Sequence, residues 1–177
     1  LGIVPKSIRW GNWALNTNSV DILEKNKFIL DSSATPGIKG HKNKPNEYNW
    51  SISKSPHPWY LSKKNYQKIK KPFSNVLEIP ISTFKFFGKT LRADPANLEL
   101  LKSSFDYYSK NVDRSTKPYC FVIISHSNES THKNGTTTKV ISTMDEFIKH
   151  VIRNKNTKFV TLIDHHKQYL NRGKNFI

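Results

Sequence analysis

One stretch, residues Ser7–Gly37, constrains the fold more than any other part of the sequence. Its first residues, Ser7–Arg9, have the pattern of a strand end that carries an arginine. A helix is predicted over Asn16–Lys27, and Phe28–Leu30 is then a short buried strand that ends at an aspartate. A helix between two strands predicts a parallel pair, whose carboxyl ends lie at one edge. In α/β folds, that edge is where sites are built.

The predicted helix has a recognisable beginning and one apolar face. Asn16 or Thr17 is suited to the N-cap, because a short side-chain oxygen there can accept a backbone N–H. Val20, Leu23 and Lys27 fall on one side of the helix at this spacing. We therefore expect that face to pack against the sheet.

The rest of the chain alternates in a similar way. Further strands are predicted at Gly2–Ile8, Val76–Ile81, Tyr119–Ser125 and Lys158–Ile163. Helices are predicted from Asp94-Pro95 and from a capping box, Thr143-x-x-Glu146, through about Arg153. Phe84–Leu91 is expected to form a loop or a short helix. This order predicts an α/β protein with parallel strands.

Composition excludes several classes of protein. A chain of 177 residues with 36% hydrophobic residues is long enough for one domain with a real core. It contains no run of about 18 apolar residues, so no membrane span is predicted. Cys120 is the single cysteine of the chain, so an internal disulfide is excluded. It lies in an apolar run, which favours a place in the core.

The formal charge of +16 raises the question of nucleic-acid binding. The basic residues are mostly lysines scattered along the chain, and Asn is abundant too, a joint bias that an AT-rich coding sequence would produce. We therefore interpret most lysines as a solvated surface and do not expect nucleic acid as the partner. Lys63–Lys71 is the exception, a local cluster that could face an anionic polymer or membrane.

Several motifs, taken in order, resemble the polysaccharide deacetylases (carbohydrate esterase family four). Arg9, Gly11 and Trp13, followed by the helix and by Asp31-Ser32-Ser33 and Pro36-Gly37, resemble that family's third and fourth motifs. The downstream matches are Trp50 with Pro56, Pro58-Trp59-Tyr60 and Ser62, then Leu77-Glu78-Ile79-Pro80, then the fifth motif at Ile124-Ser125-His126. The resemblance extends over most of the chain, roughly from Ile3 to Ile163.

The resemblance implies a distorted (β/α) barrel. Residues 1–163 would be the C-terminal part of that barrel, and 164–177 a basic C-terminal tail. The family's first two motifs, a Thr-Phe-Asp-Asp segment and a His-x-x-x-His segment, supply the catalytic base and the metal ligands. Neither occurs in this sequence. We therefore expect an N-terminal half, in the same gene or on another chain, to hold the divalent metal, with zinc the first choice and no ligand from this chain.

The function implied is metal-dependent hydrolytic N-deacetylation of an N-acetylated polysaccharide or surface-glycan sugar, the work of a hydrolase acting on a linear amide C–N bond. His126 would be the general acid for the leaving nitrogen, since its ordinary pKa is near 6.5. Asp31 would hold or tune this histidine, and Arg9 would orient the base carboxylate from the first motif. Trp13 and Tyr60 would be flat platforms for the sugar ring.

Simpler interpretations remain open for the same residues. His126 could be a hydrogen-bonded structural histidine, Asp31 a turn former, and Trp13 a core residue. His165-His166 is interpreted as part of the tail, because adjacent residues on a strand point to opposite faces. Two other functions are also open: an inactive carbohydrate-binding relative without a metal site, and a basic nucleic-acid-binding module. The cytoplasm and the cell envelope are both open as locations.

Overall fold

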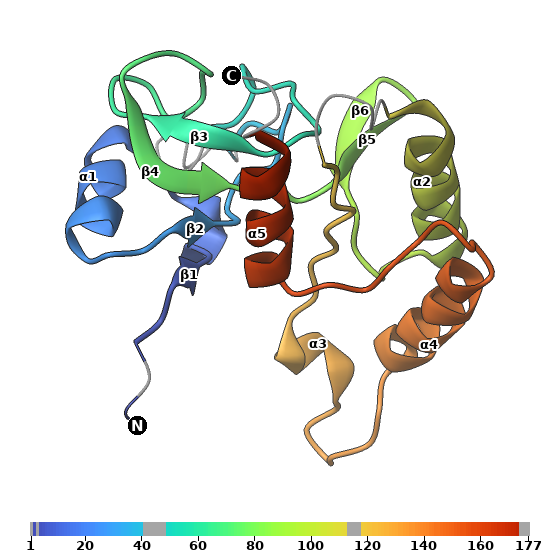
Figure 1. The fold of residues 1–177 in the computed structure, drawn as a ribbon. Helices are drawn as coiled ribbons and strands as arrows, with labels where there is room; N and C mark the ends of the chain where they lie inside the picture. The colour runs from blue at the N-terminus through green and yellow to red at the C-terminus, as the bar shows by residue number, and fades with distance from the viewer. Residues whose placement is uncertain (1, 3, 41–48, 113–117, 174–177) are drawn as a thin grey trace.

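The computed structural model describes residues 2, 4–40, 49–112 and 118–173 (Figure 1). Within these ranges the main sheet has four strands in the order β1-β2-β4-β3. Its strands are β1 (Ser7–Ile8), β2 (Leu30–Asp31), β3 (Trp59–Ser62) and β4 (Phe73–Glu78). Strands β1, β2 and β4 are parallel, as predicted, and β3 pairs antiparallel with β4. The predicted Gly2–Ile8 strand is shorter than expected, and its Ile3 lies outside the described residues.

Helix α1 (Thr17–Lys25) covers one face of this sheet. Asn16 is its N-cap, since the side-chain oxygen accepts the Ser19 N–H at 3.0 Å. The buried side chains of the helix pack in a cluster with strand residues and two tryptophans, namely Leu15, Val20, Leu23, Trp50, Trp59, Leu61 and Val76. Lys27 was wrongly placed on this face, because the helix ends at Lys25 and Lys27 is exposed with a φ of 61°.

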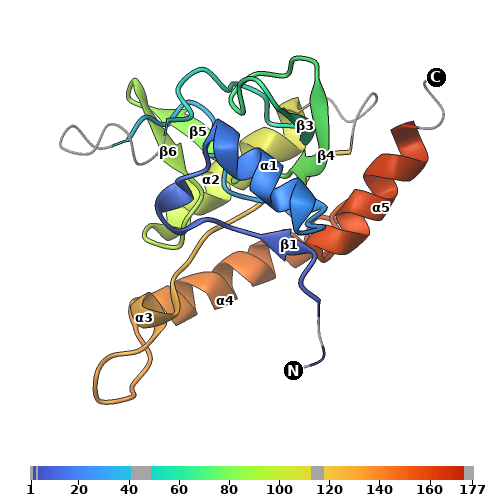
Figure 2. The same cartoon turned by 90° about the vertical axis from the view of Figure 1, so that its left-hand side faces the viewer.

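Helix α5 (Leu162–Gly173) packs on the sheet through a second cluster (Figures 1 and 2). Its Leu162, Ile163 and Tyr169 contact the cluster that contains Leu30 and Leu77. The predicted strand at Lys158–Ile163 is therefore wrong. The helix starts inside the segment predicted to be a strand, because Thr161 Oγ1 accepts the backbone N–H of Asp164 at 3.1 Å and so caps its N-terminus. The apolar run did not indicate this capping bond.

A hairpin replaces the loop or short helix expected at Phe84–Leu91. Strands β5 (Thr83–Phe86) and β6 (Lys89–Arg92) pair antiparallel in full register. Phe87 and Gly88 join them, with φ values of 45° and 75°. Two consecutive positive φ values give a turn whose twist matches that of the flanking strands, so a Phe-Gly pair closes the hairpin despite the penalty for Phe.

The apolar segment Tyr119–Ser125 runs beside the main sheet without forming the strand that was predicted there. Two backbone–backbone bonds link it to its neighbours, Ser82 N–H to the Val122 carbonyl at 2.9 Å and Ile124 N–H to the Ala93 carbonyl at 3.0 Å, and the Val122 N–H donates to the Ser82 hydroxyl at 3.0 Å. Both partners lie outside regular strands, so no ladder forms. Val122 and Ile124 are nevertheless buried in the cluster beneath α5.

Helices α2 (Leu98–Asn111) and α4 (Lys139–Ile152) begin at different caps from those predicted. Asn97, and not Asp94, is the N-cap of α2: its side-chain oxygen accepts the Leu100 N–H at 3.1 Å. Asp94 instead accepts the Ala96 N–H, which makes a turn before the helix. Thr138 is the cap of α4, so Thr143 lies inside the helix, where its side chain is buried.

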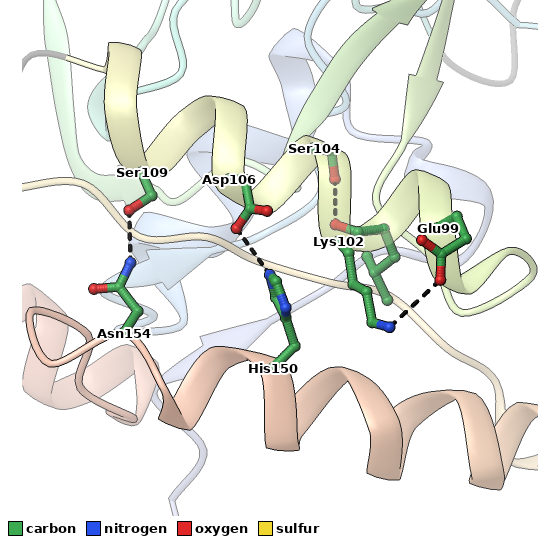
Figure 3. A network of polar contacts seen from close by, with 8 residues as sticks. Glu99, Lys102, Ser104, Asp106, Ser109, His150 and Asn154 are labelled. Atoms are coloured by element: carbon green, nitrogen blue, oxygen red, sulfur yellow. Dashed lines mark hydrogen bonds and ion pairs between the residues drawn. The ribbon is translucent and has the colours of Figure 1, made fainter.

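Polar bonds join the two helices (Figure 3), which also share an aromatic core. His150 of α4 bonds Asp106 of α2 at 2.8 Å, and Asn154, just after α4, donates to Ser109 at 2.8 Å. In that core the ring of Phe105 packs edge to face against Phe121 and Phe147. The pair therefore forms a layer of its own beside the sheet.

Candidate functional site

Three charged residues follow or end the three parallel strands at one edge of the sheet. Arg9 follows β1, Asp31 ends β2, and Glu78 ends β4. The register pairs Ile8 with Asp31 and Asp31 with Glu78. A parallel sheet brings these positions together, because the carboxyl ends of its strands lie side by side.

Asp31 and Glu78 are both completely buried, with 0% of each side chain exposed. Asp31 Oδ1 accepts the Ser33 hydroxyl at 2.8 Å, and Glu78 Oε1 accepts the Ala34 N–H at 2.8 Å. Their remaining oxygens receive no hydrogen bond from any other residue in the described ranges. The two side chains are register partners on neighbouring strands, and their charges interact.

The electrostatics of this pair favour one protonated carboxyl group. Burial raises the pKa of Glu78 well above that of a free glutamate, and the negative charge of Asp31 raises it further. Burial also raises the pKa of Asp31. Two neighbouring buried carboxyls cannot both ionise without a large cost, so one of them keeps its proton. We assign that proton to Glu78.

Arg9 ties the loop after β2 to the end of β1. Its Nε donates to the Ser32 carbonyl at 2.8 Å and its Nη2 donates to the Ser32 hydroxyl at 3.0 Å. The Trp10 N–H donates to the Ser33 hydroxyl at 2.9 Å. Burial of the guanidinium lowers the pKa of Arg9, while the negative charges of Glu78 and Asp31 act in the opposite direction. Much of the rest of this side chain is exposed, so the cluster reaches the surface at Arg9.

His126 is exposed and lies just before α3 (Ser127–Ser130). Its backbone N–H donates to Glu129 Oε2 at 3.2 Å, and the Glu129 N–H donates to its carbonyl at 3.0 Å. These reciprocal bonds fix the backbone and leave the imidazole ring toward solvent. No hydrogen bond joins His126 to the buried Asp31. The structure thus brings Arg9 and Asp31 together, but not His126 with either of them.

The two predicted sugar platforms lie in different surroundings. The ring of half-buried Trp13 has the Arg92 guanidinium 4.7 Å from its centre, which covers one face. The Trp13 carbonyl also accepts the indole N–H of Trp50 at 3.1 Å. Tyr60 is half-buried and packs edge to face on Tyr169 of α5, with the ring centres 6.0 Å apart. Each ring is therefore partly used in packing.

Glu78 is the site residue that the sequence reasoning missed. It belongs to the Leu77-Glu78-Ile79 run, which was used only to locate a strand. A single charge inside an apolar run is the signal that could have found it. Such a residue is buried with its neighbours and must then find a polar partner.

The described side chains do not fit the metal that the family resemblance implies. Among residues 2, 4–40, 49–112 and 118–173, no group of three or more His, Cys, Asp or Glu side chains could hold a metal ion. His165 and His166, interpreted as tail, instead lie in α5 with 2% and 9% of their surface exposed. No helix in these same ranges is long and apolar enough to cross a membrane.

Comparison with models of known protein families, with curated proteins and with solved structures finds no match to this chain.

Proposed function

We propose that this chain is the C-terminal part of a metal-dependent deacetylase that hydrolyses the N-acetyl group of a polysaccharide or surface-glycan sugar. The observation that supports the proposal is the contact between the third and fourth motif segments at one sheet edge. Arg9 bonds Ser32, which directly follows Asp31 at the end of the neighbouring parallel strand. Residues that are 23 positions apart in sequence thus form one polar unit where α/β enzymes build their sites.

The position of β1 supports the proposed barrel. This strand is at the end of the sheet order β1-β2-β4-β3, so within the described ranges its second side pairs with no strand. An open strand edge is a place where another strand can add. In the proposed enzyme, the last strand of the N-terminal half pairs here and continues the distorted (β/α) barrel.

His126 has the catalytic role in this part of the enzyme. Hydrolysis adds water to the acetyl carbonyl carbon and breaks the bond from that carbon to the sugar nitrogen. The leaving nitrogen needs a proton, and the exposed imidazole of His126 gives it. The reciprocal bonds with Glu129 restrain the backbone that carries this ring.

Arg9 and the Asp31–Glu78 pair are positioning residues in this proposal. The exposed part of Arg9 orients the base carboxylate that the N-terminal half contributes. The buried carboxyls act indirectly. They accept hydrogen bonds from Ser33 and Ala34 and so fix the loop to which Arg9 is bonded. Trp13 and Tyr60 offer the sugar their uncovered ring surfaces.

The residues described in this chain supply no metal site, so the proposal assigns the metal entirely to the N-terminal half. An Asp-Asp segment and a His-x-x-x-His segment should then be encoded either in frame, upstream of the Leu1 codon, or in a partner gene. Absence of both from the same reading frame and from any co-purifying chain would overturn the assignment.

The activity test uses the complete protein and N-acetylchitooligosaccharides, with released acetate as the readout. His126→Ala should lower the rate by about 100-fold or more, since general acid catalysis contributes a factor of that order. His132→Ala is the matched control, because His132 is also exposed and only six residues away. It should remain within about twofold of the unaltered protein. Equal rates for the two variants would contradict the role of His126.

A further inference from the structure

The turn between β5 and β6 presents two phenylalanine rings to solvent. Phe87 is 91% exposed, more than any other large hydrophobic side chain in the described ranges, and Phe86 is 40% exposed. The two rings pack edge to face with their centres 4.5 Å apart. A turn with two consecutive positive φ values is usually formed by Asn-Gly, so the hairpin itself does not require a ring at position 87. This ring is therefore available to a partner outside the chain.

Lysines flank the aromatic turn on both strands. Lys85 precedes the two phenylalanines, Lys89 follows Gly88, and both lysines are exposed. Neither lysine forms an ion pair with a residue in the described part of the chain. The hairpin thus ends in an apolar tip between two uncompensated positive charges.

The loop between β3 and β4 repeats this arrangement. Ile69, which is 54% exposed, stands between Lys68 and Lys70, and both lysines are exposed. Lys68 and Ile69 line an open groove of about 360 Å³ together with Ile52, which is 50% exposed, and Lys54. An exposed isoleucine is therefore bordered by lysines here too, and a second isoleucine lies in the same groove.

Hydrogen bonds join the two segments that form this groove. The Ser53 hydroxyl donates to the Gln67 carbonyl at 2.7 Å, and the Ile52 N–H donates to Gln67 Oε1 at 3.4 Å. The first of these segments also reaches the base of the hairpin, where Ser55 lines a small cavity with Thr83. The β3–β4 loop and the β5–β6 turn both lie toward the top of Figures 1 and 2. The two apolar tips therefore belong to one side of the molecule.

The segments on this side carry uncompensated positive charge. Glu78 is the only acidic residue between positions 49 and 93, and it is completely buried. The lysines of this range that form no ion pair with a described residue are Lys54, Lys64, Lys68, Lys70, Lys71, Lys85 and Lys89. The basic surface is defined by the exposed lysines and apolar residues of these segments, Ile52, Lys54, Lys64, Lys68–Lys71, Lys85–Phe87 and Lys89.

We propose that the basic surface binds an anionic lipid bilayer, with the lysines among the headgroups and with Phe87 and Ile69 inserted toward the acyl chains. Lysines are attracted to acidic phospholipids, and apolar side chains beside them are stabilised when the bilayer covers them. Two separate apolar tips on one side suit an extended, flat partner. A single-stranded nucleic acid stacks its bases on aromatic rings, but Ile52 and Ile69 offer no such ring. The basic surface contains none of the residues of the proposed deacetylase site.

The first test is cosedimentation of the full chain with large unilamellar vesicles, made of phosphatidylcholine alone or of phosphatidylcholine mixed with phosphatidylserine. The mixed vesicles should bind the chain at least about 10-fold more strongly, because each of several lysines contributes to the attraction. Added salt should weaken this binding, since it screens the charges. Equal binding to the two kinds of vesicle, or binding to neither, would overturn the proposal.

Phe87→Asn separates the role of the ring from the stability of the hairpin. Asn-Gly is the favoured pair for this turn, so circular dichroism and thermal unfolding should show an intact fold. Affinity for the mixed vesicles should fall about 10-fold, since the bilayer no longer covers the ring. Phe159→Asn is the matched control, because Phe159 is 65% exposed but lies between α4 and α5, outside the basic surface. It should change the affinity by about twofold at most, and equal losses in both variants would contradict insertion of Phe87.

A charge-matched comparison tests the lysines. The double variant Lys85→Gln/Lys89→Gln should lower the affinity for the mixed vesicles by about 10-fold or more. Lys155→Gln/Lys158→Gln removes the same charge from exposed positions between α4 and α5 and should cause a clearly smaller loss. Equal losses would mean that net charge alone attracts the chain and would refute a defined surface.

Single-stranded DNA is the probe for the other kind of polyanion. At the same salt concentration it should bind the unaltered chain more weakly than the mixed vesicles do. Tighter binding of the DNA, with the same loss in Lys85→Gln/Lys89→Gln, would identify the basic surface as a nucleic-acid site and overturn the proposal.

Discussion

Asp31 and Glu78 are register partners on adjacent parallel strands, and neither side chain has any exposed surface. Each uses one oxygen to hold the loop that follows β2, through Ser33 and Ala34. The other oxygen of each has no hydrogen-bond partner within the described residues, and burial favours the protonated form of Glu78. The edge of the sheet that carries the proposed site therefore depends on a carboxyl group that resists ionisation.

The stability of the fold should depend on the protonation of Glu78. Its pKa is raised in the folded protein, so above about pH 4.5 the folded state binds a proton that the unfolded chain has lost. The free energy of unfolding should then fall as pH rises, by up to about 1.4 kcal/mol per unit, until the raised pKa is passed. Glu78→Gln mimics the protonated form and should remove this fall. Urea unfolding at pH 5 and pH 7 measures it.

Comparison of the Glu78→Gln variant with the unaltered protein isolates the contribution of Glu78 to the pH dependence of stability. Burial lowers the pKa values of His165 and His166, which makes stability decrease as pH falls below about 6.5, but in both proteins equally. Glu99→Gln, at an exposed position on α2, serves as the control and should keep the dependence of the unaltered protein. A Glu78→Gln variant with the same pH profile as the control would show that Glu78 is ionised in the fold.

Replacement of Arg9 by lysine should weaken the edge of the sheet. The guanidinium makes two bonds to Ser32 in a fixed fork, and an ammonium group cannot reproduce that geometry. We expect Arg9→Lys to lower the free energy of unfolding by about 1 kcal/mol, the usual worth of one net hydrogen bond. Arg153→Lys, at an exposed position after α4, should have almost no effect in the same chemical denaturation experiment.

The cap of α1 can be tested at two adjacent positions. Asn16 accepts the Ser19 N–H, whereas Thr17 is already inside the helix. Asn16→Ala should therefore cost about 1 kcal/mol of stability, and Thr17→Ala should be close to neutral, since alanine has the higher helix propensity. Thermal unfolding followed by circular dichroism gives both values. The opposite ranking would move the start of the helix by one residue.

The isolated chain should neither retain zinc nor release acetate. Its described residues form no ligand cluster, and the proposal places the metal on the N-terminal half. After dialysis against zinc and then buffer, we expect well under one equivalent of metal and no acetate from N-acetylchitooligosaccharides. One equivalent of retained zinc together with turnover would mean that this chain contains a complete site, which would contradict the division of labour proposed above.

The sequence predicted best where local chemistry and burial agree. A cap at Asn16 or Thr17, the Val20 and Leu23 face and the parallel pairing of β1 with β2 follow from short-range patterns; the face and the pairing are confirmed, and the cap is Asn16, the first of the two. The sequence-based prediction was wrong where an apolar run is compatible with both a strand and a helix. Leu162 and Ile163 suited a strand, but a capping bond at Thr161 and contacts with Leu30 and Leu77 made them the start of a helix.

The site was predictable only in part for a related reason. Arg9 and Asp31 stand at the ends of predicted strands, so their meeting could be inferred from topology. The pairing of Asp31 with Glu78 required the register of β4, which lies 47 residues further along and depends on long-range packing. The burial of His165 and its unpaired Nε2 also could not be predicted, because a tail was expected where the structure has a buried helix.

The packing of α5 on the sheet also sets the order of events during protein synthesis. Leu30 and Leu77 find their covering side chains roughly 130 and 85 residues later in the chain. At about 5–20 residues per second, β2 waits on the order of 7–26 seconds after translation before α5 is made. For the last part of that interval, this face has only Val122, Ile124 and their neighbours as cover. It is therefore the part of the sheet that is closed last, when the final helix is made.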